Sequence, residues 1–564
     1  MAVSIVQNFF NNNPGVLFVR FVVLDHAGVL RVSVMPRKAT LQVAADRSFN
    51  ANMSAFVAGI TAFDTPNLEA LQLGVDKIVP DWATLKVCSF YPSHAIVMCA
   101  VREASKAEPG DDDHDGFSLC PRTVLAKQVQ RARSAVGQDI LVGLELEFLL
   151  YKQGSTNFIR PITASPNFNS TFLYDAALAR LLDDIAQTLE RADIEILKYH
   201  PEGMGPGLFE IVLPPYGPLQ AADAAVYCRE AIKTVARQHG YEATMCPFPF
   251  EQGDLYQCLH ASVSVSDTAA ADSFLSGLLG NLPAIGAFAM PSVLQSDRRL
   301  ACDTTKQLVR WGRDNKSCAV RERRLGLWEM RFSDAAMNPY LTTAALIAAG
   351  IAGIESQKDL TVKPLTHMSF NPLETVSKDE LAITDAIPTS LEGRLLQLEN
   401  DEILRTALGS RLVDEFVRLK RCEIKAASRM TVAEINERLR LIFYSLVKGA
   451  SHIIITFTDP VSLLFHKLPP NEAQSWAAKM KRQAIKPLQG IVPYAPFEDD
   501  FYKGHLAYLR CAEDECVHPP GQAKFIAVAG IQETDELPTS HMPWLEIADT
   551  TAERILGLVA KVRM

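Results

Sequence analysis

Two glutamates alternate with apolar residues in a run near the middle of the chain. Glu145 and Glu147 lie in LVGLELEFLL, residues 141–150. In a strand, alternate side chains project to opposite faces, so both carboxylates share one face and the apolar residues share the other. Two like charges in an apolar run are costly unless a cation neutralises them, and Mg²⁺ prefers oxygen ligands. The run therefore predicts a metal site, although a solvent-facing strand with two surface glutamates would show the same pattern.

Further carboxylates follow in two segments downstream. Glu202 precedes a turn rich in Gly and Pro, and Glu210 lies in the β-like run FEIVL, so the turn could bring both carboxylates to one point. In GLWEMRFSDAAMNPYL, Glu329 and Arg331 share one strand face. Taken alone, such a couple is more typical of an ion pair than of a catalytic pair, so the residue types leave both interpretations open.

The elements that must position these side chains are of mixed type, which predicts an α+β fold. Residues 16–100 alternate short β-rich runs with turns, and the long middle part alternates strands with amphipathic helices. Pro121 fits the first turn of one helix, and Gly240 ends another. The expected helices cover residues 123–135, 174–192, 221–240, 341–355 and much of 391–446.

Composition excludes several classes of protein. The 564 residues are 48% hydrophobic and 21% charged, as in an ordinary globular protein with more than one domain. The net charge of -9 provides no broad basic field for nucleic acid or an anionic membrane.

The start, MAVSIVQNFFNNNPG, lacks the pattern of a secretory signal, and no apolar run is long enough to span a membrane, so a cytoplasmic protein is expected. The 11 cysteines lack CxxC spacing and are expected to be reduced and mostly buried. The acidic run at 106–116 is interpreted as a solvated linker.

Five ordered motifs resemble those of the glutamine synthetase family. They are a G-x-E-x-E-F strand at 143–148, H-x-E-x7-E at 200–210, H-x-S at 260–262, a W-G-x-x-N-(R)-S-x-x-x-R segment at 311–321 and E-x-R-x-x-D-x-x-x-N-P-Y-L at 329–341. Pro80, Asp81 and Thr84 resemble residues of the family's β-grasp module, and residues 389–425 resemble its closing helical region. The resemblance implies a β-grasp domain at 15–105 and a catalytic α/β domain at 117–446.

The resemblance also implies a reaction. An ATP-dependent ligase of this type phosphorylates a carboxylate, typically that of glutamate, and an amine or ammonia then displaces phosphate, with Mg²⁺ or Mn²⁺ ions neutralising the phosphate charge. The expected partners are small-molecule acid and amine substrates, with no nucleic acid and no membrane. Family members assemble as stacked rings, which implies a homo-oligomer.

The family's site residues carry over to positions in this chain. Glu147, Glu202 and Glu210 would hold one ion, and Glu145 with Glu329 the other. Arg298 matches the arginine that grips the substrate carboxylate, whereas Arg321 and Arg331 match those that stabilise phosphate oxygens. The remaining expected contacts are made to the nucleotide by Ser262, Lys316 and Arg321, and to the second ion by His260.

Several positions depart from the family pattern. Cys258 occupies the place of a metal-binding histidine, unless His260 takes over through a register change, and a thiol is a poor ligand for Mg²⁺. Lys316 replaces an arginine, Asn50 stands where an ammonium-binding aspartate is expected, and the flap glutamate falls near Asp303 or Thr304. These changes favour an amine other than ammonia, and they also leave open a catalytically inactive scaffold or regulatory protein.

Residues 451–564 resemble the last third of an α/β-hydrolase. Asp514 and His541 match the acid and histidine of a Ser-Asp-His triad, but no G-x-S-x-G elbow occurs in the chain. Without a nucleophile, the pair is expected to be structural. A fused relic, a product of joined neighbouring genes and a poorly folded tail all remain open for this fragment.

Overall fold

The computed structural model describes two compact units, residues 1–447 and 448–564. The described residues are 2–46, 51–54, 59–63, 75–103, 118–152, 176–202, 207–247, 256–293, 308–366, 385–430, 434–435, 454–455, 471, 483–484, 507–513, 519–528, 531–539 and 543–562.

The first unit begins with a six-stranded mixed sheet, in the order β2-β1-β6-β4-β3 with β5 paired to β6. Strands β1 and β2 form an antiparallel hairpin, and β1 runs parallel to β6. The elements are α1 (Ala2–Asn12), β1 (Phe18–Leu24), β2 (Leu30–Pro36), α2 (Arg37–Ala45), β3 (Ala51–Ser54), β4 (Val75–Pro80), β5 (Lys86–Val87) and β6 (His94–Arg102). The β-rich runs expected in residues 16–100 are therefore confirmed.

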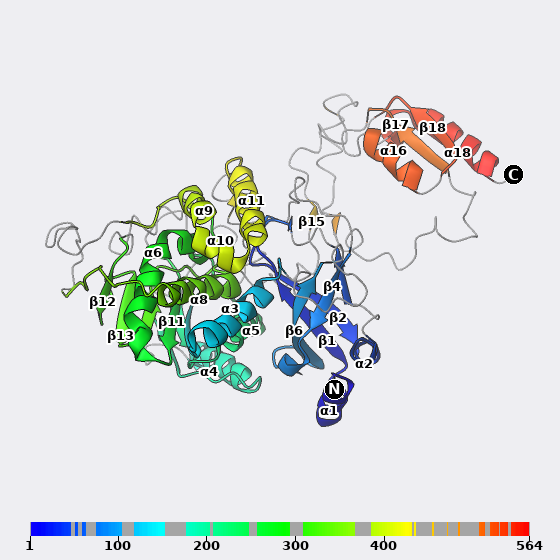
Figure 1. Ribbon diagram of the computed structural model, residues 1–564. Coiled ribbons are helices and arrows are strands. Elements are labelled where there is room, and N and C mark those ends of the chain that lie inside the picture. Colours follow the sequence, from blue (N-terminus) through cyan, green and yellow to red (C-terminus); the bar gives the residue numbers. More distant parts are fainter. Residues whose placement is uncertain are drawn as a thin grey trace. The chain divides into compact units, whose positions relative to one another are not determined.

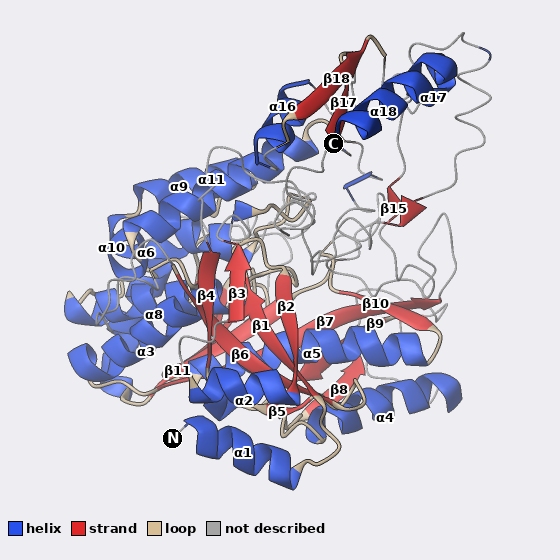
Figure 2. Cartoon of the chain, turned by 90° about the vertical axis from the view of Figure 1, so that its right-hand side faces the viewer, coloured by secondary structure: helices blue, strands red, loops and turns tan. Residues whose placement is uncertain are grey.

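Strand β1 of this small sheet is buried on both of its faces. Alternate residues of β1, Val19, Phe21 and Val23, join Val6 and Phe10 of α1 in one apolar cluster. Their neighbours Val22 and Leu24 belong instead to the main core of the unit. In Figure 2, α1 and α2 lie together beside the sheet.

An eight-stranded sheet carries the chemistry-bearing residues, in the order β12-β13-β14-β11-β7-β9-β8 with β10 paired to β7. Neighbouring strands in this order are antiparallel, except that β12 and β13 are parallel. The strands are β7 (Ile140–Lys152), β8 (Lys198–Pro201), β9 (Leu208–Val212), β10 (Tyr241–Thr244), β11 (Leu259–Val265), β12 (Trp311–Arg313), β13 (Val320–Arg324) and β14 (Leu327–Met330).

The helices expected from the sequence are present in the first unit, whereas α1, α2 and α6 (Ala271–Ala289) were not expected. Pro121 occupies the first turn of α3, and α5 stops before Gly240, whose φ is 78°. The helices that follow the small sheet in the chain are α3 (Pro121–Val136), α4 (Ala176–Glu190), α5 (Pro218–Gln238), α6 (Ala271–Ala289), α8 (Pro339–Glu355), α9 (Leu391–Asn400), α10 (Glu402–Leu408) and α11 (Ser410–Ala427). Figure 1 shows α9, α10 and α11 grouped together in yellow. Of the expected helical region, most residues after 430 lie outside the described part of the chain.

Small residues let α6 and α8 approach closely. A Cβ atom added at Gly277 would lie 2.3 Å from the carbonyl oxygen of Ala349, and one at Gly353 would lie 2.1 Å from that of Ser273. Beside this contact, Phe274 stacks on Trp328 with ring centroids 5.3 Å apart. Helix α6 therefore packs on the apolar face of the large sheet at β14, opposite the face that carries Glu329.

The second unit contains a small parallel pair of strands with helices. The strands β17 (Ala507–Cys511) and β18 (Glu533–Leu537) are parallel, and α16 (Pro519–Val528) connects them. The unit ends in α17 (Pro543–Glu546) and α18 (Ala548–Val562), and it also contains the short pair β15 (Ile454–Ile455) and β16 (Gln483–Ala484). Asp514 and His541, the expected remnants of a triad, lie outside the described residues. The mixed α+β class is confirmed.

Candidate active site

The two glutamates of β7 project from one face of the large sheet, as their alternation predicts. Leu144, Leu146 and Phe148 are fully buried in the core on the other face. Glu147 is 4% exposed, so it is a buried carboxylate and not one of a pair of surface glutamates. The solvent-facing interpretation of this strand is therefore wrong.

Strand pairing assembles a polar row from segments that are far apart in the sequence. Directly paired residues of neighbouring strands place their side chains on the same face. The pairs are Glu147 with Glu210, Glu210 with His200, Glu145 with His260, Ser262 with Glu329, and Glu329 with Arg321. We call these residues, with Glu202, Cys258 and Arg331, the polar row.

One end of the polar row is a group of three residues that could hold a metal ion, His200, Glu202 and Glu210. His200 Nε2 lies 3.1 Å from Glu210 Oε1, and its Nδ1 lies 3.8 Å from Glu202 Oε2. The hydrogen bond to Glu210 raises the pKa of His200 above its usual value. Glu202 and Glu210 therefore meet as predicted. His200 was not predicted as a candidate ligand, although its place in the H-x-E motif, two residues from Glu202, is a signal that could have identified it.

The centre of the row contains a second group, Glu145, His260 and Glu329. His260 Nδ1 lies 3.5 Å from Glu145 Oε2 and 3.9 Å from Glu329 Oε1. Burial raises the pKa of Glu145, and the nearby Glu329 carboxylate raises it further. The strand register thus brings His260 to the two glutamates that were expected to share an ion.

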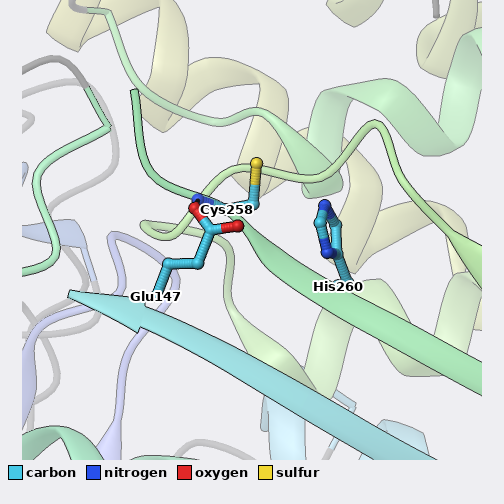
Figure 3. Close-up of side chains that lie close together, drawn as sticks. All are labelled: Glu147, Cys258 and His260. Carbon is cyan, nitrogen blue, oxygen red and sulfur yellow. Dashed lines mark hydrogen bonds between the residues drawn. The ribbon is translucent and has the colours of Figure 1, made fainter. Parts of the chain in front are cut away.

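A third group, Glu147, Cys258 and His260, overlaps the second (Figure 3). The backbone N–H of Cys258 donates a hydrogen bond of 2.7 Å to Glu147 Oε2. The sequence expectation treated Cys258 and His260 as alternatives. The structure brings both to the polar row, because residues two apart on a strand share a face.

Two arginines hold the carboxylate of Glu329. Arg321 Nη1 lies 2.9 Å from Glu329 Oε2, and Arg331 Nη1 donates to Oε1. Burial alone would raise the pKa of this carboxyl group, but Arg331, His260 and Arg321 together outweigh burial and hold the pKa at about 2. Glu329 is therefore a charged, buried carboxylate at neutral pH.

The residues expected at the nucleotide lie close to this clamp or outside the described chain. Lys316 is exposed, and its carbonyl oxygen accepts a hydrogen bond of 3.1 Å from Arg331 Nε. Ser262 is half-buried opposite Glu329. Their contacts with a nucleotide remain predictions. The expected positions outside the described residues are Arg298, Asp303, Thr304 and Asn50.

The donor atoms of the polar row fit divalent cations. The His200 group and the Glu145 group offer carboxylate oxygens and imidazole nitrogens, which suit Mg²⁺ or Mn²⁺. Buried carboxylates are costly without a compensating positive charge. Among the described helices, none is both long and apolar enough to cross a membrane.

Comparison with known proteins gives relatives along most of the chain. Protein fluG of Emericella nidulans is 28% identical over 76% of this chain, which spans only 49% of that protein. A gamma-glutamylpolyamine synthetase, GlnA3 of Streptomyces coelicolor, is 26% identical over 72% of the chain and 89% of its own length. A glutamate–methylamine ligase of Methyloversatilis universalis is 26% identical over 75% of the chain and 96% of its own length.

A solved structure shares the fold. The structure described as apo GmaS without ligand has a TM-score of 0.64 at 24% identity, and the match covers 76% of this chain and 97% of that one. Residues 118–438, more than half of the chain, match the family described as the glutamine synthetase catalytic domain. The chain therefore belongs to the glutamine synthetase family.

Proposed function

We propose that this protein is an ATP-dependent ligase that joins a carboxylate, on glutamate or a related acid, to an amine other than ammonia. The observation that carries the proposal is the polar row, where carboxylates, imidazoles and two arginines from six neighbouring strands meet on one sheet face. Phosphoryl transfer makes its main demand on positioning and charge stabilisation, and such a row can supply both.

Two parts of the row would hold divalent cations. Glu147, Glu202 and Glu210, with His200 beside them, would bind one ion, and Glu145, His260 and Glu329 would bind the other. Such ions would supply positive charge that stabilises the phosphate during transfer. Because the polar row lies on paired strands, its side chains are held by a rigid scaffold.

The arginines and Lys316 would bind the anionic groups. Arg331 and Arg321 present planar guanidinium groups that suit phosphate oxygens. Both contact Glu329, and we propose that they also donate hydrogen bonds to phosphate oxygens. Arg298 is proposed to bind the substrate carboxylate, and Ser262 and Lys316 to bind the nucleotide.

The reaction would proceed in two balanced steps. A carboxylate oxygen attacks the γ-phosphorus, and the bond to the β,γ-bridging oxygen breaks with release of ADP. The amine nitrogen then attacks the acyl carbon, the carbon–oxygen bond breaks, and phosphate leaves as the nitrogen loses a proton. The proposal of a substituted amine is supported by two relatives whose names specify a polyamine and methylamine.

Finer features of the fold and assembly are also part of the proposal. The β1–β2 hairpin, α2 and the parallel pairing of β1 with β6 support a β-grasp domain. The β17–α16–β18 unit supports an α/β-hydrolase-like fragment, which we propose to be inactive as an esterase because the chain has no G-x-S-x-G elbow. Membership of a ring-forming family supports a homo-oligomer.

Two observations favour a second candidate, a catalytically inactive scaffold. Cys258 stands where the family has a metal-binding histidine, and both oxygens of Glu329 are engaged by arginines. A protein of this second kind would retain the fold without turning over ATP.

The test is phosphate release from Mg²⁺-ATP with glutamate and a panel of primary amines, with ammonium for comparison. We expect amine-dependent release, stronger with one or more substituted amines than with ammonium, and its loss in Glu147→Ala. Glu190→Gln, a change at an exposed residue of α4, serves as the control that should leave the rate unchanged. Absence of turnover and of ATP binding in the folded protein would instead support the scaffold.

A further inference from the structure

Cys258 is fixed against Glu147 by the backbone. The N–H of Glu147 donates to the carbonyl oxygen of Cys258 at 3.1 Å, and the N–H of Cys258 donates to Glu147 Oε2 at 2.7 Å. The reciprocal bonds orient the Glu147 carboxylate beside the cysteine side chain. The thiol is thus built into the polar row and is not merely a buried cysteine near it.

His260 completes a group with a distinct set of donors. The ligand atoms of Glu147, Cys258 and His260 all lie within 4.8 Å of one another. The three residues are 4%, 2% and 5% exposed. His260 lies on β11, and Cys258 directly precedes this strand. Figure 3 shows the Cys258 sulfur and the His260 ring projecting to the same side. The group therefore combines one sulfur, one nitrogen and one oxygen donor in a buried place.

The orientation of His260 suits metal binding. Its Nδ1 lies 3.5 Å from Glu145 Oε2. A carboxylate at one ring nitrogen is the usual arrangement that orients a metal-binding histidine and selects the other nitrogen as the ligand. Glu145 lies on the Nδ1 side of the ring, so Nε2 of His260 would be the atom that binds an ion shared with Cys258 and Glu147.

The donor set selects a different cation from the two carboxylate-rich groups. Mg²⁺ binds oxygen and rarely takes a thiolate, whereas Zn²⁺ accepts sulfur, nitrogen and oxygen ligands in a four-coordinate site. Three protein ligands leave a fourth position for water or a substrate atom, as in catalytic zinc sites. The Glu145 and His200 groups offer no sulfur ligand.

We propose that Glu147, Cys258 and His260 form a site for Zn²⁺ or a similar thiophilic divalent cation, with Cys258 bound as the thiolate. The inference builds on the proposed ligase function, because Glu147 and His260 would also serve the Mg²⁺ sites of that reaction. Zinc at this site would therefore compete with Mg²⁺ for these two ligands.

Cobalt provides a direct spectroscopic test on the full-length protein, stripped of metal and without ATP, acid or amine. Co²⁺ should bind with a thiolate-to-metal charge-transfer absorption. Cys258→Ser should abolish that band and weaken Zn²⁺ binding by at least the roughly tenfold loss that changes around metal ligands cause. Cys228→Ser, at another buried cysteine on α5, should retain both the band and the affinity.

A second measurement needs no variant, in case Cys258→Ser does not fold. X-ray absorption of the zinc-loaded wild-type protein should reveal one sulfur ligand at about 2.3 Å. A zinc shell without sulfur, or a cobalt band that persists in folded Cys258→Ser, would overturn the proposal. Amine-dependent ATP turnover without any sulfur-bound metal would likewise overturn this inference while leaving the ligase function intact. Sulfur-bound metal in the zinc-loaded protein, together with no turnover by the zinc-free protein assayed with Mg²⁺-ATP, would support the site and contradict the ligase.

Discussion

At the scale of single residues, Glu329 shows how a charged carboxylate is tolerated inside the protein. It is 1% exposed, yet Arg321 and Arg331 each engage one of its oxygens. Removing one partner of a buried ion pair leaves an uncompensated charge, which costs more than the pair itself contributes. The clamp therefore serves both the fold and the proposed phosphate site.

Arg331→Met should destabilise the protein by about 3 kcal/mol, at the low end of the range for breaking a buried pair because Arg321 remains. Arg323→Met is the matched control, because Arg323 is 43% exposed and lies 3.8 Å from the same carboxylate. An exposed ion pair contributes about 0–1 kcal/mol. Denaturant unfolding measures both changes, and equal effects of the two variants would contradict the clamp.

The pH dependence of the metal-free protein follows from His200. Its pKa is raised in the folded state by Glu210, so the folded protein holds the proton more tightly than the unfolded chain. The contribution is fully present below the ordinary histidine pKa of 6.5 and is lost as pH rises through the raised value. Denaturant unfolding in the presence of a chelator measures the free energy of unfolding at each pH. As pH rises through this range, we expect this free energy to fall more in the wild-type protein than in His200→Gln. A larger loss in the variant would contradict a raised pKa of His200 in the folded protein.

At the scale of elements, the faces of the strands were predictable from the sequence but their register was not. Alternation in residues 141–150 was enough to place Glu145 and Glu147 on one face, and Pro121 and Gly240 marked helix ends. The pairing of His260 with Glu145 depends on hydrogen bonds between strands that are more than 100 residues apart. A single-strand pattern contains no information on that register. Cys258 and His260 were for this reason treated as alternatives, although the strand presents both.

The contact between α6 and α8 predicts that a Gly→Ala change inside a helix destabilises the protein. Gly→Ala inside a helix normally stabilises by up to about 1 kcal/mol. Gly353→Ala should instead destabilise by about 1–3 kcal/mol, because the new methyl group would meet backbone atoms of α6. Gly557→Ala, inside α18 and with nothing within 4 Å of the added Cβ, should not destabilise the protein. Thermal unfolding distinguishes these outcomes, and a stabilised Gly353→Ala would contradict the packing.

At the scale of the whole molecule, the chain divides after Val447 into two compact units. The family match at 118–438 and all the residues of the polar row fall in the first unit. Sequence resemblance identified this catalytic region because its motifs are local and ordered. The sequence could not decide what the second unit does, since half of a triad without a nucleophile specifies no chemistry.

A chain that ends at Val447 should therefore fold and retain the proposed amine-dependent turnover. We expect a cooperative unfolding transition and a turnover rate within about twofold of the full-length rate, because the whole polar row lies before Val447. A twofold change in rate corresponds to less than 1 kcal/mol of activation free energy. Circular dichroism and the phosphate-release assay measure the two properties. Loss of turnover by a folded truncated chain would show that residues 448–564 contribute to activity.

The central claim is that the polar row catalyses amide formation through an acyl phosphate. Glutamate labelled with heavy oxygen in its side-chain carboxylate tests it directly, because the attacking oxygen becomes part of the phosphate that leaves. Mass spectrometry of the phosphate released with Mg²⁺-ATP and the best amine should reveal transfer of one labelled oxygen per turnover, and Glu147→Ala should release none. Amine-dependent phosphate that contains no label would contradict the acyl-phosphate reaction.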